Sequence, residues 1–179
     1  MAIMKDIFGG INTGGTFAGW QLINQSAKDM PKEIKEAVIK AQEGYTGATF
    51  KPLWLIGAQL VNGMNYLLIC DSIVNNIDKT IVGLVVNVPF NGEAKIVRVI
   101  DTNKAEVPAA INALYGAAKK VLNSANTKLL FYIGSQVVKG INYYVIAEVK
   151  PLRNGDPYAA LVTINMFDGE ATIKIDKLK

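Results

Sequence analysis

The sequence predicts an α+β protein built from two tandem domains, each with one helix packed on a four-stranded antiparallel sheet. Three observations support this: a repeat at a constant offset of 77 residues, one amphipathic helix per copy, and strand-like runs joined by turns. Residues 31–102 match 108–179 at about three positions in ten without a gap. Two long copies favour two domains, because solenoids usually need three or more short repeats. We expect domains at 1–102, with 1–30 as an N-terminal trunk, and at 103–179.

One helix is expected near the start of each copy. Pro31 marks the first and Pro108 the second, because proline is tolerated in the first turn of a helix. After Pro108 the apolar residues keep helical spacing and form one stripe, which consists of Ile111, Leu114, Tyr115, Ala118, Val121 and Leu122. A helix with a single apolar stripe buries that stripe against another element.

Four strand-like runs follow each helix. In the first copy they cover residues 50–60, 64–71, 80–88 and 95–100. Glycine-containing and asparagine-rich turn signals separate these runs, and the second copy repeats their order: Asn62-Gly63, Asn75–Asp78 and Asn91-Gly92, then Lys139-Gly140, Asn154-Gly155 and Asp168-Gly169. Asn-Gly and Asp-Gly between β runs predict hairpins. Four strands joined in this way form a meander, and the helix is expected to cover one of its faces.

The absence of histidine from the chain limits the chemistry that it can perform. Without histidine, Cys–His and Ser–His catalysis and histidine-ligated metal are excluded. The chain also contains no phosphate-binding loop and no dinucleotide fingerprint. The single cysteine, Cys70, lies in an apolar strand pattern and corresponds to Ala147 in the second copy, so we expect a buried thiol. The sequence therefore predicts neither an enzyme nor a protein with a cofactor or metal.

Charge and hydropathy argue against nucleic acid and membranes as partners. The net charge is +4, and no dense run of Lys and Arg stands beside aromatic residues. Residues 52–70 carry no charge, but polar residues and glycine interrupt them. A buried hairpin explains this segment better than a membrane-spanning helix. Residues 1–30 lack the pattern of a signal peptide, so we expect a soluble cytoplasmic protein, with a processed secreted form left open.

One short motif occurs in both copies. "GAQLVNGMNY" at 57–66 returns as "GSQVVKGINY" at 134–143. A Gln-x-Val-x-Gly hairpin followed by Asn-Tyr, placed after a single helix, resembles the cystatins, which inhibit papain-like cysteine proteases. The resemblance covers nearly the whole chain beyond about residue 18. It implies tandem cystatin-like domains and a reversible inhibitor of a papain-like cysteine protease.

The resemblance also implies which residues bind the protease. In the family a trunk glycine and two hairpin loops form a wedge that occludes the active-site cleft. The matching residues in the first copy are Gly19 in the trunk, Gln59, Leu60, Val61, Asn62 and Gly63 in the first hairpin, and Pro89 and Phe90 in the second. Those in the second copy are Gln136, Val137, Val138, Lys139, Gly140 and Phe167.

Each residue type suits such a contact. Glycine permits a positive φ in a tight hairpin, and valine offers stiff apolar surface at little cost in entropy. A phenylalanine beside a turn is expected to be exposed and to act as a binding anchor. The first copy is predicted to bind more strongly, because Met166 in place of Pro89 should loosen the second loop and Lys139 adds a charge.

Two matters stay open at this stage. A cystatin-like binding module that no longer inhibits a protease is the alternative function, and a titration against papain would separate the two. Strand exchange through the first hairpin, giving a domain-swapped dimer, and pairing of the tandem copies with each other are both compatible with the sequence.

Overall fold

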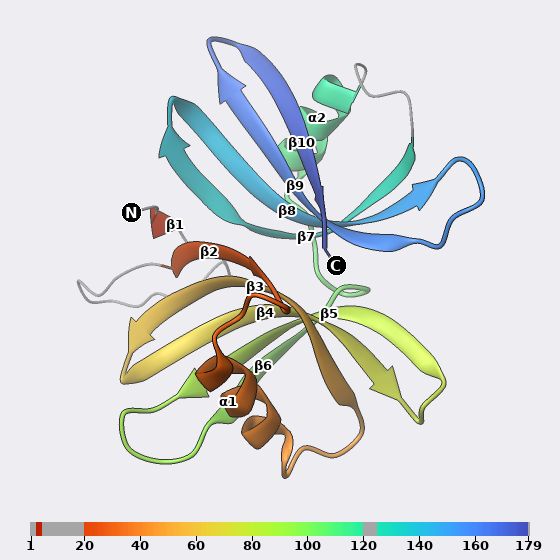
Figure 1. Ribbon diagram of the computed structural model, residues 1–179. Helices are drawn as coiled ribbons and strands as arrows, with labels where there is room; N and C mark the ends of the chain where they lie inside the picture. The colour runs from red at the N-terminus through yellow and green to blue at the C-terminus, as the bar shows by residue number, and fades with distance from the viewer. Residues whose placement is uncertain (1–2, 5–19, 120–124, 179) are drawn as a thin grey trace. The chain divides into compact units, whose positions relative to one another are not determined.

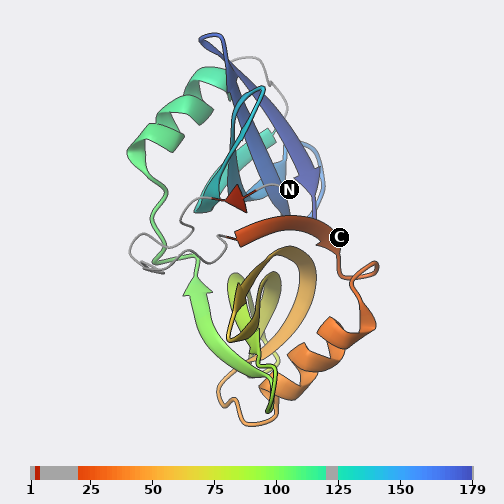
Figure 2. The same cartoon turned by 90° about the vertical axis from the view of Figure 1, so that its left-hand side faces the viewer.

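The computed structural model describes residues 3–4, 20–119 and 125–178 (Figure 1). The chain divides into two compact units, the first ending at Thr102 and the second beginning at Asn103. Each unit contains one helix that lies across one face of a strongly twisted antiparallel sheet (Figure 2).

The first sheet has six strands in the order β1-β2-β3-β4-β5-β6. The strands and the helix of this part of the chain are β1 (Ile3–Met4), β2 (Trp20–Ser26), α1 (Lys32–Gln42), β3 (Thr49–Val61), β4 (Gly63–Val74), β5 (Asp78–Val88) and β6 (Lys95–Asp101). Strands β3 to β6 form the expected meander, and α1 packs on β5 and β6.

The second sheet has four strands in the order β10-β9-β8-β7. Its elements are α2 (Ala109–Lys119), β7 (Ala125–Val138), β8 (Gly140–Pro151), β9 (Tyr158–Phe167) and β10 (Glu170–Lys177). Helix α2 packs on β9 and β10. The predicted helices and the four strands after each of them are therefore confirmed as elements.

The predicted fold class is wrong, because the chain is mostly β and its first sheet is larger than four strands. Strand β2 precedes α1 and pairs antiparallel with β3, with Gln21 opposite Ala58 and Ser26 opposite Trp54. The register shifts between Leu22 and Gln25, and such a bulge interrupts the two-residue alternation by which a strand is recognised. Two domains of one helix on four strands do not describe this chain.

The repeat extends to details of the backbone in the first hairpin of each unit. Strand β3 shifts its register against β4 at positions 53 and 56, and β7 shifts against β8 at 130 and 133. All four positions obey the offset of 77 residues. The two copies therefore share the same bulges as well as the same motif.

The ungapped repeat fails after this hairpin. Met64 on β4 lies opposite Val88, whereas Ile141 on β8 lies opposite Met166, so β9 is displaced by one residue relative to β5. The extra residue lies in the longer connection between β8 and β9. Because neighbouring residues of a strand face opposite sides, the structural counterpart of Leu84 is Val162.

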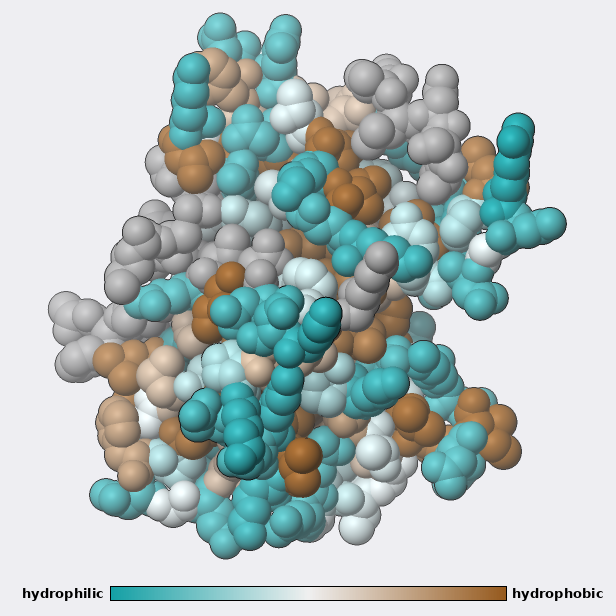
Figure 3. Space-filling model, in the orientation of Figure 1, coloured by the Kyte–Doolittle hydropathy of each residue, from teal (hydrophilic) through white to brown (hydrophobic). Residues whose placement is uncertain are grey.

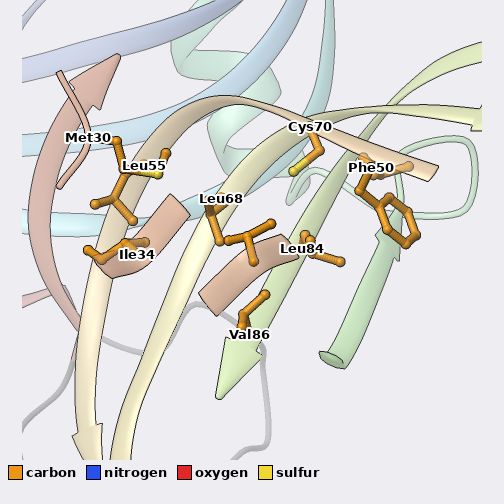
Figure 4. Packing of buried hydrophobic residues seen from close by; sticks show 10 residues of the cluster. Met30, Ile34, Phe50, Leu55, Leu68, Cys70, Leu84 and Val86 are labelled. Atoms are coloured by element: carbon orange, nitrogen blue, oxygen red, sulfur yellow. The ribbon is translucent and has the colours of Figure 1, made fainter. Parts of the chain in front are cut away.

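The core of the first unit lies between α1 and one face of the sheet (Figure 4). Ile34 and Val38 from the helix meet Leu55, Leu68 and Leu84 from three neighbouring strands. The second unit has an equivalent core, which contains Ile111, Tyr115, Val145, Ala147, Val162 and Ile164. The helical stripe predicted from the sequence is thus the face that is buried.

The central strands are buried on both faces of the sheet. Leu67 and Leu68 are neighbours on β4 and point to opposite faces, and both are fully buried. A nearly continuous apolar run is typical of a strand covered on two sides. Apolar alternation alone therefore does not mark which face of β4 belongs to the helix.

Candidate protein-binding site

The turn between β3 and β4 needs glycine for two reasons. Gly63 has a φ of +105°, which L side chains rarely adopt. A Cβ atom at this position would also overlap the carbonyl oxygen of Val88 and approach the Cα atom of Pro89. The missing side chain thus lets the first hairpin touch the backbone of the second.

The connection between β5 and β6 forms the second loop at the same end of the sheet (Figure 1). The β5–β6 pairing ends at Asn87 opposite Lys95. The six residues 89–94 lie between the two strands, and Phe90 is 68% exposed. We refer to residues 60–63 together with 89–94 as the first tip.

The side chains of the first hairpin divide between surface and interior. Leu60 and Asn62 are exposed, and Val61 is half-buried. Gln59 is only 7% exposed, and its Oε1 atom accepts a hydrogen bond from Nδ2 of Asn65 at 3.2 Å. Gln59 therefore supports the first tip from below, while Leu60 and Asn62 form its surface.

The second unit builds a corresponding surface, the second tip, from residues 138–140 and 167–169. Gly140 has a φ of +90°, and a Cβ atom there would overlap the carbonyl oxygen of Met166. Val138 and Phe167 are exposed. The Nζ atom of Lys139 lies 4.8 Å from the centre of the Phe167 ring, within the range of a cation–π interaction.

The second tip is tighter than expected. Asp168 and Gly169 both have positive φ and form a two-residue turn, and pairing continues through Met166 opposite Ala171. Pro89 has no N–H group to donate to such a ladder, and the first tip has the wider loop. The expectation that Met166 loosens the second tip is therefore wrong.

Three predicted residues are only partly described or not described. Gly19 lies outside the described residues, so its part in a wedge stays a prediction. Gln136 and Val137 belong to β7, but their side chains lie outside the described part of the chain.

The Cys70 thiol is an unsuitable nucleophile. It is fully buried in the core of the first unit. Burial raises the pKa of the thiol, and the charge of neighbouring Asp71 raises it further. The thiol stays protonated at neutral pH and cannot attack a ligand. The predicted buried thiol is confirmed.

Other kinds of site were sought in the described ranges. There, no group of three or more His, Cys, Asp or Glu is placed to hold a metal ion. Neither helix in those ranges has both the length and the apolar character needed to span a membrane. On the face shown in Figure 3, hydrophobic residues lie in small separate groups between hydrophilic ones.

No family model matches the chain, and no curated protein matches it significantly. The resemblance to the cystatins therefore rests on the motif residues of the two hairpins and on their position after a helix.

One residue of the site was missed in the sequence. The Nδ2 atom of Asn87 donates a hydrogen bond to Oδ1 of Asn65 at 2.8 Å, directly below the first tip. An asparagine at the end of the apolar run of β5 was the available signal, because a polar residue in such a strand needs a partner.

Proposed function

We propose that the chain is a reversible protein inhibitor of papain-like cysteine proteases and that its tips occlude the active-site cleft. One observation carries the proposal. In each unit the two loops that the motif marks as contact segments touch through their backbones, at Gly63 with Val88 and at Gly140 with Met166. Segments far apart in the sequence thus form one narrow projection.

Such a projection suits tight binding without a chemical reaction. The loops are held by hairpin ladders up to Val61 and Val88, so little conformational entropy is lost on binding. Leu60 and Phe90 present apolar area at the end of the projection. An aromatic side chain that enters a pocket of the partner is a common source of binding energy.

The same geometry explains how a tip would escape cleavage. Gly63 lies in a closed turn with positive φ, and its neighbour on the other side is the backbone of Val88. A protease cleaves a segment that enters its cleft in an extended form. A turn fixed in this way covers the cleft without offering an extended peptide bond.

The alternative is a protein-binding module without inhibitory activity, and the second tip favours it for the second unit. Lys139 covers part of the Phe167 ring, so this tip is more polar than the first. A charged group at a contact that must be desolvated weakens binding to an apolar cleft. The second tip then suits a partner with acidic groups.

A titration tests the proposal. Active papain of known concentration is mixed with increasing amounts of the full chain, and residual hydrolysis of a small substrate is measured. We expect a tight-binding curve, recovery of activity on dilution, and an intact mass for the chain. The variant Cys70→Ala should inhibit equally, because the thiol is buried. No inhibition at micromolar concentration would leave the non-inhibitory module as the function.

A further inference from the structure

A row of side-chain amides crosses three strands below the first tip. Gln59, Asn65 and Asn87 lie directly opposite one another on β3, β4 and β5. Asn87 donates to Asn65 at 2.8 Å, and Asn65 donates to Gln59 at 3.2 Å. Each of these side chains is buried or half-buried, so its hydrogen bonds matter for stability.

The second unit repeats the row at the same level. Asn142 lies opposite Asn165, whose Nδ2 atom donates to Oδ1 of Asn142 at 2.7 Å. The ungapped repeat would instead place Ile164 at the position of Asn87. Strand β9 is displaced by one residue, and its asparagine is displaced with it. The pairing of amides is thus maintained where the sequence numbering is not.

Hydrophobic burial does not choose between these registers. Val85 and Val86 are adjacent on β5 and both buried, as are Leu67 and Leu68 on β4. A slip by one residue exchanges apolar side chains for apolar side chains on each face. Register is weakly specified when the two faces of a strand resemble each other.

The amides discriminate between registers strongly. A slip by one residue would place the Asn65 amide opposite Val86 or Val88 instead of Asn87. A buried amide without a partner costs more than its hydrogen bond contributes when formed. A slip would also move the second loop by about 3.3 Å along the strand. The contact between Gly63 and Val88 would then be lost.

We propose that Asn65 and Asn87, and likewise Asn142 and Asn165, are positioning residues that set the strand register and so align the two loops of each tip. They act through the backbone and do not form the binding surface. The consequence for inhibition rests on the proposed function, whereas the alignment itself does not.

Amide hydrogen exchange of the full chain tests the alignment. Asn87→Val removes the donor, and Asn87→Gln retains it. Thr80→Val is the matched control, because Thr80 lies on the same strand at its opposite end. We expect exchange in residues 60–64 and 85–88 to become about tenfold faster in Asn87→Val only. Exchange in 70–74 should stay unchanged in every variant.

Two results would overturn the proposal: unchanged exchange at the tip in Asn87→Val, or faster exchange throughout the first unit, which would make Asn87 a general stabiliser. If Asn87→Val does not fold, Asn87→Ser, which keeps a hydroxyl donor, is measured by the same criteria. Asn165→Val should change exchange in 138–141 and leave the first unit unchanged.

A parallel papain titration separates this proposal from the proposed function. If the unaltered chain inhibits papain, Asn87→Val should weaken inhibition on the order of tenfold, and Asn87→Gln should restore it. Unweakened inhibition in Asn87→Val would contradict the positioning role. If the unaltered chain does not inhibit papain, the proposed function fails, and hydrogen exchange alone decides whether the amides align the loops.

Discussion

The two tips are built from nearly the same sequence, yet they differ in shape and polarity. "PFNGEA" at 89–94 forms an open loop of six residues, whereas "MFDGEA" at 166–171 closes into a two-residue turn. Phe90 is well exposed, and Phe167, at 45% exposure, lies beneath the Nζ atom of Lys139. The first tip therefore offers more apolar area to a partner.

The difference has a local and a non-local cause. Pro89 lacks the N–H group that Met166 brings to the strand ladder, so pairing stops earlier in the first unit. Strand β9 is also displaced by one residue, which places Phe167 rather than Met166 at the level of Pro89. A shared loop sequence thus does not ensure a shared loop conformation.

The largest expected effect comes from disabling each tip in turn. Gly63→Glu and Gly140→Glu both place a charged side chain at a positive φ and against a carbonyl oxygen. We expect Gly63→Glu to weaken papain inhibition on the order of a hundredfold and Gly140→Glu much less, because the first tip is more apolar. Gly44→Glu, at an open position of the first unit, is the control. Equal losses from the two tip variants would refute the ranking.

A proline in the second tip would sharpen the comparison through stability. Met166→Pro removes an N–H group from β9, which is paired on both sides, and should lower the free energy of unfolding of the second unit by about 2 kcal/mol. Urea unfolding measures this change. The reverse exchange, Pro89→Met, lets pairing extend into the first loop and should not destabilise the chain. An unaffected Met166→Pro would mean that the second tip does not depend on its ladder.

The two phenylalanines provide a smaller test. Phe90→Ala should weaken inhibition about tenfold, because an exposed aromatic side chain at a loop end is a typical binding anchor. Phe167→Ala should have a smaller effect, since Lys139 already covers its ring. Inhibition constants and melting temperatures are measured together. A larger loss for Phe167→Ala would reverse the order of the two tips.

The smallest expected effect distinguishes the two cores by pH. Burial raises the pKa of Cys70, whereas Ala147 occupies its position in the second unit. The unfolded thiol ionises near pH 8.5, so this stabilisation is present below that pH and is lost as the pH rises above it. Unfolding free energy should be about 1.4 kcal/mol lower at pH 9.5 than at pH 7.5 on account of the thiol.

Chemical denaturation under reducing conditions measures this pH dependence. Cys70→Ala should remove the contribution of the thiol and leave the second unit unaffected. The same pH dependence in Cys70→Ala and in the unaltered chain would show that other groups are responsible.

The sequence by itself determined the features that depend on neighbouring residues. Pro31 and the apolar stripe after it marked α1, and the stripe after Pro108 marked α2. Gly63 and Gly140 marked the tight turns, and both have the positive φ that only glycine adopts easily. The apolar surroundings of Cys70 were sufficient to predict its burial.

Only the tertiary structure decided which strands pair and in which register. Strand β2 was missed because a bulge between Leu22 and Gln25 interrupts its alternation, and its pairing partner β3 lies beyond α1 in the chain. The displacement of β9 was equally hidden, because its apolar residues satisfy either face of the sheet. Turns and helices follow from local conformational preferences, whereas pairing depends on hydrogen bonds between residues far apart in sequence. For that reason the amides of Asn65 and Asn87 show their common function only when the strands are side by side.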